Sequence, residues 1–124
     1  HLGLLPQSAK NFKFKGKKNY GREKILKEAK LLENAGVFSM VLECIESTLA
    51  KAITKQIKIP TIGIGASNNC DGQILVFDDL IGLNPINVRF IKKYTNIRKE
   101  ISKAVSNYAR EVKGKKFPLK KHSY

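Results

Sequence analysis

Short apolar runs constrain this chain more than any other feature, because they are too brief for helices and lack polar–apolar alternation. Three of them occur, at residues 37–44, 60–66 and 72–77. Continuous runs of this length, separated by segments with helical spacing, are typical of strands buried on both faces of a parallel sheet. The first run carries an acid, Glu43, near its end. Since α/β folds keep their chemistry at the carboxyl ends of strands, Glu43 is the first candidate for a catalytic residue.

The segment before the first run has the spacing of a helix. Residues 22–34 place Ile25, Ala29 and Leu32 on one side, and Gly36 is a natural helix stop just beyond them. This pattern predicts an amphipathic helix that packs one face against a sheet.

Two further helices are predicted downstream. One covers residues 48–56 and has Ser47 or Thr48 as its cap, and the other covers residues 96–113 and carries a clear 3.6-residue apolar stripe. With residues 1–7 as the end of another strand, the chain shows repeated β–α wiring. Its three strands and part of a fourth fit either a small open sheet or half of a (β/α)₈ barrel, which needs about 250 residues. Periodicity alone leaves both open.

Charge suggests a partner but does not identify one. The chain has 24 Lys and Arg against 10 Asp and Glu, a net charge of +14, which suits nucleic acid or an anionic surface. Only four of the basic residues are arginine, the type favoured for bidentate recognition, and the lysines are spread along the chain. We therefore favour solvated helix faces and keep a basic nucleic-acid-binding α/β module as an alternative. The one basic-aromatic cluster, at residues 12–20, is predicted to be a surface loop.

Cysteine usage and hydropathy bear on the compartment. Cys44 and Cys70 lack the spacing of a metal site, and no apolar stretch is long enough to span a bilayer. With no leader in the sequence, a reduced cytoplasmic setting without a membrane partner is predicted. Because the chain begins at His1, we expect it to be processed, truncated or the second piece of something longer.

Five strings occur in this order, and at about this spacing, in one protein family. They are HLGLLPQ (1–7), VLEC (41–44), IPTIGIGA (59–66), DGQILV (71–76) and HSY (122–124). On these strings the chain closely resembles the C-terminal half of ketopantoate hydroxymethyltransferase. The resemblance covers essentially the whole chain and is weakest at residues 11–20 and 83–93.

The resemblance implies an α/β fold, the C-terminal half of a (β/α)₈ TIM barrel. Residues 1–124 would run from the end of the fifth strand through the eighth strand and the C-terminal helices, as one part of a single domain. The implied enzyme is a cytoplasmic, Mg²⁺-dependent transferase of pantothenate and coenzyme A biosynthesis. It moves a hydroxymethyl group from 5,10-methylenetetrahydrofolate to 3-methyl-2-oxobutanoate (α-ketoisovalerate), giving ketopantoate. The family's assembly is usually a homo-oligomer, a decamer.

Two residues match the family's site. Glu43 matches the general base, and His1 matches a histidine that contacts the bound 2-oxo acid. The C3–H of a 2-oxo acid is weakly acidic, so its removal needs a positioned base and a group that holds the enolate charge. From spacing alone, Glu43 could instead cap a helix or pair with a lysine.

The family's magnesium carboxylates and substrate lysine correspond to positions that precede His1, so we assign no metal ligand here. We therefore expect the N-terminal half of the same barrel as a partner, and we expect this chain alone to be inactive. A non-catalytic half-barrel subunit is the remaining alternative. Three aspartates, Asp71, Asp78 and Asp79, are not assigned to a metal site.

Two glycines invite a different interpretation. Gly63 and Gly65 begin a dinucleotide-loop pattern, but Asn68 stands where its third glycine belongs and no helical pattern follows. We expect glycine here to let the strand end approach a ligand or a neighbouring loop. Glu46 is not assigned a catalytic role.

Overall fold

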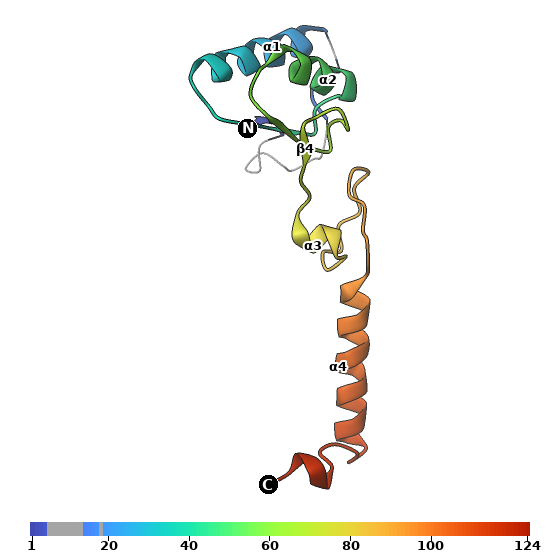
Figure 1. Cartoon of the computed structure of the whole chain (residues 1–124). Coiled ribbons are helices and arrows are strands. Elements are labelled where there is room, and N and C mark those ends of the chain that lie inside the picture. The colour runs from blue at the N-terminus through green and yellow to red at the C-terminus, as the bar shows by residue number, and fades with distance from the viewer. Residues whose placement is uncertain (5–13, 18) are drawn as a thin grey trace. The chain divides into compact units, whose positions relative to one another are not determined.

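The computed structural model describes residues 1–4, 14–17 and 19–124, and the account below is confined to them (Figure 1). The chain forms two compact units, one of residues 1–75 with 88–91 and one of residues 76–87 with 92–124. The elements, in order, are β1 (Leu2–Gly3), α1 (Asn19–Asn34), β2 (Met40–Glu43), α2 (Ser47–Gln56), β3 (Thr61–Ile64), β4 (Gly72–Gln73), α3 (Phe77–Leu80), α4 (Ile97–Lys113) and the 3₁₀ helix η2 (Lys120–His122).

The first unit is built on a parallel sheet whose four strands follow chain order, β1–β2–β3–β4. Helices α1 and α2 connect β1 to β2 and β2 to β3, which confirms the predicted α/β wiring. Leu42 pairs with Leu2 on one side and with Gly63 on the other. Because the strands are parallel, their carboxyl ends share one edge of the sheet.

One face of the sheet carries the core. Met40 and Leu42 of β2 are buried in a cluster with residues of both helices, and Figure 1 shows α1 and α2 on the same side of the sheet. The helical members of this cluster are Ile25, Ala29, Leu49, Ala50 and Ile53. Side chains alternate along a strand, so Val41 and Glu43 lie on the opposite face.

That opposite face is apolar and partly exposed in the described residues: Val41 and Ile62 are half-buried, whereas Ile64 is buried. The register places Ile62 and Ile64 of β3 beside Val41 and Glu43, and Ile74, just after β4, is 56% exposed. Parallel sheets are normally covered on both faces, whereas in the described residues the helices of the core cover only one face of this sheet.

The cap of α2 differs from the prediction. Ser47 or Thr48 was expected, whereas Glu46 is the N-cap, and its carboxylate accepts hydrogen bonds from the backbone N–H groups of Thr48 (3.1 Å) and Leu49 (3.0 Å). Arg22 of α1 also donates to it at 2.7 Å. Glutamate is the cap at this position because its longer side chain reaches both the helix terminus and a cation on the neighbouring helix.

The last strand is shorter than predicted. A strand was expected over residues 72–77, but β4 ends at Gln73, and Phe77 begins the short helix α3. Ile74 still donates its N–H to the carbonyl of Gly63 at 3.0 Å. β4 is an edge strand with one partner, and Asp78 and Asp79 favour the first turn of a helix, so the extended conformation stops early.

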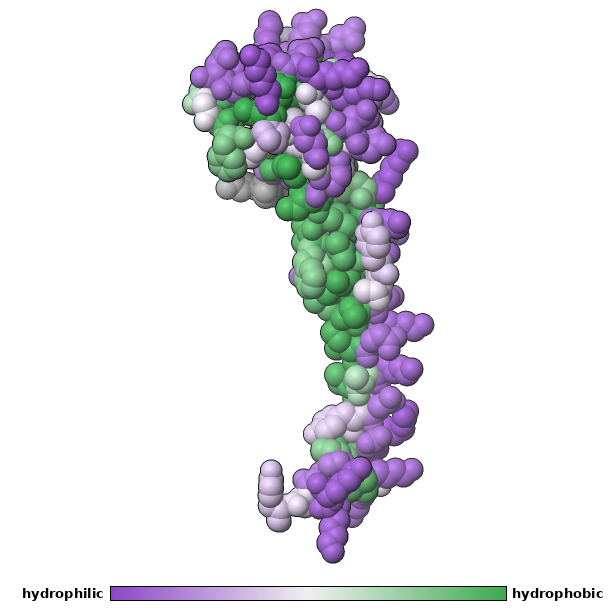
Figure 2. All heavy atoms as spheres, viewed as in Figure 1, coloured by the Kyte–Doolittle hydropathy of each residue, from purple (hydrophilic) through white to green (hydrophobic). Residues whose placement is uncertain are grey.

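The second unit carries the long predicted helix. α4 begins after Asn96, whose side chain accepts from the N–H of Lys99 at 3.1 Å, close to the predicted start. None of its residues is buried, and Figure 2 shows its hydrophobic residues gathered along one side. Four residues of this apolar side are between 43% and 60% exposed: Ile101, Val105, Tyr108 and Val112. No described helix combines the length and apolar composition of a membrane span.

The register of β1 against β2 depends on Gly3. Its φ is +101°, and a Cβ there would lie 2.0 Å from the carbonyl oxygen of Glu43. Gly36 offers a matched control, because its φ is +85° and nothing lies within 4 Å of its Cβ position. We expect Gly36→Ala to lower the free energy of unfolding by about 1–2 kcal/mol, the cost of a left-handed alanine, and Gly3→Ala to lower it clearly more. Urea unfolding measures both, and equal losses would contradict the steric role of Gly3.

Candidate active site

Glu43 lies at the carboxyl end of β2, on the face of the sheet opposite the helices. Its side chain is 15% exposed, and its backbone carbonyl accepts the N–H of Leu4 at 2.9 Å. The next residue, Cys44, has a φ of +50°, in the left-handed region that non-glycine residues rarely adopt. This turn ends the strand immediately after Glu43. Such conformations cluster at functional sites, where surrounding contacts hold them in place.

The structure brings together the two residues that sequence analysis assigned to the site. His1 Nε2 lies 3.0 Å from Glu43 Oε2, and the two side chains are 33% and 15% exposed. The contact arises because β1 and β2 pair in parallel, with Gly3 opposite Glu43. Glu46, and not Glu43, caps α2, and among the described residues the Glu43 carboxylate contacts His1 and no lysine.

Two neighbouring glutamates have opposite electrostatic environments. Burial raises the pKa of the Glu43 carboxyl above its usual value. Hydrogen bonds from the Thr48 side chain and backbone, with further donors including Arg22, lower the pKa of Glu46 to about 2. A carboxylate with a raised pKa at a strand end is suited to proton transfer, whereas Glu46 is fixed as a charged helix cap.

Burial, and next the charge of Glu43, also raise the pKa of the Cys44 thiol. Because the thiolate is the reactive form, Cys44 is poorly suited to act as a nucleophile. Its thiol is buried, and its part in the site is to turn the backbone.

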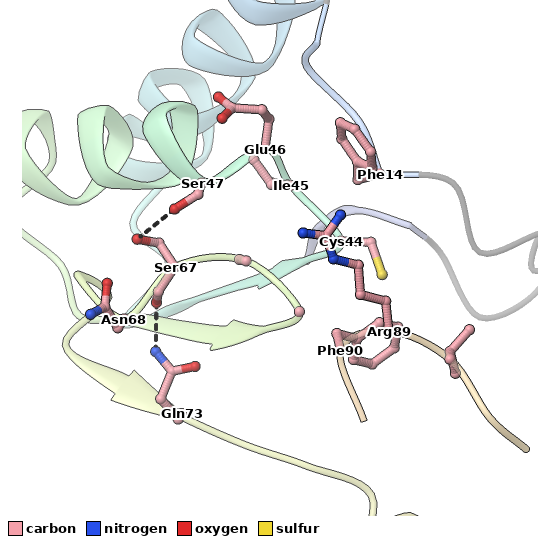
Figure 3. Close-up of a pocket in the computed structure, with 13 residues that line it drawn as sticks. Phe14, Cys44, Ile45, Glu46, Ser47, Ser67, Asn68, Gln73, Arg89 and Phe90 are labelled. Atoms are coloured by element: carbon pink, nitrogen blue, oxygen red, sulfur yellow. Dashed lines mark hydrogen bonds between the residues drawn. The ribbon is translucent and has the colours of Figure 1, made fainter. Parts of the chain in front are cut away.

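A cavity of about 840 Å³ adjoins this strand end, between the turn after β2 and the loop after β3 (Figure 3). Ser47 Oγ donates to Ser67 Oγ at 3.4 Å, and Gln73 Nε2 donates to the Ser67 carbonyl at 2.7 Å. Its wall also includes Phe14, Asn68, Arg89 and Phe90. Sequence analysis assigned none of these to a site, because they come from segments without a periodic pattern.

Gly65 was the one signal in the sequence that pointed to this cavity. Its φ is +60°, and a Cβ there would lie 2.7 Å from Cγ of Phe90. The expectation that glycine at this strand end allows a close approach is confirmed, and the approaching group is the Phe90 side chain.

The described residues do not form a metal centre. No three His, Cys, Asp or Glu side chains among them gather closely enough to hold a metal ion. Asp71 instead accepts from the N–H and hydroxyl of Thr61 at the amino end of β3, and these bonds lower its pKa. Asp78 and Asp79 lie in α3, in the second unit.

The basic-aromatic cluster is only partly described. Phe12, Lys13 and Lys18 lie outside the described residues. Phe14 lines the cavity, and Lys17 Nζ lies 6.0 Å from the centre of its ring. Tyr20 lies in the first turn of α1, which begins earlier than the predicted Arg22.

A parallel sheet with helical connections and a carboxylate at its carboxyl edge defines part of an α/β protein, and it is consistent with part of a (β/α)₈ barrel. The sequence profile of the ketopantoate hydroxymethyltransferase family matches residues 1–120, and the chain belongs to this family.

Curated relatives agree with the profile. The chain is 64% identical to the 3-methyl-2-oxobutanoate hydroxymethyltransferase of Pelagibacter ubique (strain HTCC1062), over 100% of this chain and 48% of that protein. It is 45% identical to the protein of that name from Clostridium botulinum (strain Alaska E43 / Type E3) and 47% identical to that of Francisella tularensis subsp. tularensis (strain FSC 198). These alignments cover all of this chain and 46% and 48% of those proteins. The chain thus spans about half the length of the curated relatives it matches.

Removal of the negative charge from Glu43 and from Glu46 should have different effects on the free energy of unfolding. The lowered pKa of Glu46 stabilises the fold above about pH 4.5, and this stabilisation is lost as pH falls towards 2. The raised pKa of Glu43 means that stability is lost as pH rises through its folded-state value. At pH 7 we expect Glu46→Gln to lower the free energy of unfolding by about 1 kcal/mol, the worth of an N-cap. Glu43→Gln should leave it unchanged or raise it.

Urea unfolding at pH 7 and pH 3 tests this pair of variants. The deficit of Glu46→Gln should shrink at pH 3, because the wild-type protein then loses the same stabilisation. A larger loss for Glu43→Gln than for Glu46→Gln at pH 7 would contradict the assignment of the two environments.

Proposed function

We propose that this chain supplies the base-bearing half of a ketopantoate hydroxymethyltransferase site, in a cytoplasmic enzyme. The enzyme transfers a hydroxymethyl group from 5,10-methylenetetrahydrofolate to 3-methyl-2-oxobutanoate, giving ketopantoate. The observation that carries the proposal is the half-buried carboxylate of Glu43, held at a strand end with a raised pKa and in contact with His1.

Glu43 is proposed as the general base. Its carboxylate takes the proton from C3 of the 2-oxo acid, and the electron pair of the C3–H bond passes into the enolate. Water first hydrolyses the methylene bridge of the donor: its oxygen bonds to the one-carbon unit, both C–N bonds break, and tetrahydrofolate leaves with the two protons of the water on its nitrogens. The enolate carbon then bonds to the carbon of the resulting formaldehyde, and the formaldehyde oxygen takes the proton from Glu43 and becomes the hydroxyl. A pKa raised by burial moves the base towards the operating pH, where general-base catalysis is most efficient.

His1 is proposed to position the base and to contact the 2-oxo acid. Its Nε2 lies within hydrogen-bond distance of Glu43 Oε2, so an N–H there fixes the orientation of the carboxylate. One third of the His1 side chain stays exposed, which leaves part of the ring accessible to a ligand in the same site.

The remaining parts of the site are proposed to come from the N-terminal half of the same barrel. Two observations support this: β1 and β4 are the edges of the sheet among the described residues, and the apolar face that carries Val41 and Ile62 is partly exposed there and is not covered by α1 or α2. The magnesium ligands belong to that half, and the complete enzyme is proposed to be a homo-oligomer. The nucleic-acid alternative rests on net charge alone.

Replacement of Glu43 tests the base. In the complete enzyme, with both halves of the barrel, we expect Glu43→Gln to slow exchange of the C3 proton of 3-methyl-2-oxobutanoate for deuterium by about 10²-fold or more. The exchange is followed by proton NMR. Glu46→Gln is the matched control and should keep exchange near the wild-type rate, since that side chain caps α2. Near-normal exchange by Glu43→Gln would remove Glu43 as the base.

The chain alone provides a second test. The 124-residue chain should not accelerate exchange above the rate in buffer with Mg²⁺, and addition of the N-terminal half should restore exchange. The reason is that a single carboxylate without a group to hold the enolate charge leaves most of the barrier in place. Robust exchange by the chain alone would refute the half-site proposal.

A further inference from the structure

We infer that residues 15 and 16, which we call the strap, are positioning residues for the reaction: their backbone holds the turn after β2 and so fixes the direction of the Glu43 side chain. This inference rests on the proposed function and deepens it, because it names the segment that keeps the proposed base in place.

The strap continues the pairing of β2 beyond the end of the strand. β1 pairs with β2 as far as Glu43, and past that point Lys15 forms an isolated parallel bridge with Ile45. The Lys15 N–H donates to the Cys44 carbonyl at 2.7 Å, and the Glu46 N–H donates to the Lys15 carbonyl at 2.8 Å. One residue of the strap thus holds both ends of the turn between β2 and α2.

The backbone of Cys44 needs this support. Its φ of +50° is unfavourable for a residue with a Cβ, and such a conformation persists only where neighbouring contacts hold it. Two bonds do so from opposite sides: its carbonyl accepts the N–H of Lys15, and its own N–H donates to the Ile64 carbonyl at 2.9 Å. Without the first bond, Cys44 can return to an ordinary conformation. Glu43, the residue directly before it, then loses the fixed end of its strand.

Gly16 seats the strap against the core. Its φ is +83°, and a Cβ there would lie 2.2 Å from Cδ2 of Leu49. Leu49 of α2 is completely buried in the core cluster, so its side chain has little room to turn aside. A side chain at Gly16 would therefore push the strap away from α2 and weaken the bonds of Lys15 to the turn.

The turn matters to the reaction through the surroundings of Glu43. The carboxylate is 15% exposed, and the titratable groups beside it among the described residues are His1 and the Cys44 thiol. Burial raises the pKa of Glu43. If the strand end loosens, water reaches the carboxylate and its pKa falls towards the usual value. The direction in which Glu43 meets the C3 proton is then no longer fixed.

The experiment uses the complete enzyme, with both halves of the barrel, and follows C3 proton exchange of 3-methyl-2-oxobutanoate across pH by proton NMR. Gly16→Ala displaces the strap, and Gly36→Ala is the matched control, because its φ is +85° and nothing lies within 4 Å of its Cβ position. Lys15→Pro removes the N–H that Cys44 accepts. A double variant, Gly16→Ala with Leu49→Val, removes the Cδ2 atom that the new Cβ would meet.

We expect Gly16→Ala and Lys15→Pro to slow exchange at pH 7 about tenfold or more, because the base is misplaced. The midpoint of the rise of the rate with pH should move to a lower pH, because a more exposed carboxylate has a lower pKa. Gly36→Ala should keep the rate within about twofold and the midpoint unchanged. The double variant should regain the rate and the midpoint, although it has lost core packing and unfolds at a lower urea concentration than Gly16→Ala.

An unchanged rate and midpoint in Gly16→Ala would overturn the inference. A slower rate with the wild-type midpoint would overturn it as well, since loss of folded protein alone lowers the rate in that way. A double variant that behaves like Gly16→Ala would remove Gly16 from the strap. If Lys15→Pro does not fold, the two glycine variants still decide. Failure of the proposed function is a separate result, because the wild-type enzyme would then show no C3 proton exchange at any pH.

Discussion

The register of the parallel sheet is the constraint on which the site depends. Backbone bonds from Met40 N–H to the Pro60 carbonyl and from Cys44 N–H to the Ile64 carbonyl, each 2.9 Å, fix β2 against β3 along its whole length. Leu42 is fully buried between β1 and β3 and holds this register. A shift of one residue would turn Glu43 into the helix-covered core and expose Leu42, so the hydrophobic pattern itself keeps the carboxylate on the open face.

The same short segment holds both the acid that we propose as the base, Glu43, and the acid that caps the next helix, Glu46. At Glu43 the fold accepts a buried carboxylate and, one residue later, a left-handed backbone at Cys44. At Glu46 it gains a helix cap that also binds Arg22 of α1. The buried carboxylate and the left-handed backbone lower the stability of the fold. The helix cap and the Arg22 contact of Glu46 offset that loss a few residues further along the chain.

Two apolar surfaces are at least partly exposed in the described residues, and further polypeptide from the rest of the relatives' length could cover the first of them. One is the sheet face that carries Val41 and Ile62, and the other is the stripe of α4. The chain spans about half the length of its curated relatives, and parallel sheets are stable when both faces are covered. The open sheet face therefore supports the proposal that further polypeptide completes the barrel.

The repeating strand and helix elements of the fold could be predicted from local sequence pattern. The strand at Met40–Glu43, the helices around Ile25 and Ile53 and the stop at Gly36 follow from periodicity and backbone preference, and the placement of Glu43 at a strand end follows from them. These features depend on residues within a few positions of one another, so the sequence alone determines them.

Other features depend on groups that are distant in sequence, and only the tertiary structure decided them. Glu46 displaced the shorter side chains as the cap because Arg22 lies across from it on another helix, and β4 stopped at Gln73 because it has a single partner strand. Strand pairing brought His1 to Glu43, and chain folding carried Arg89 and Phe90 to the same edge. Such contacts produce no periodic pattern in the sequence, since each depends on which distant segments the folded backbone brings together.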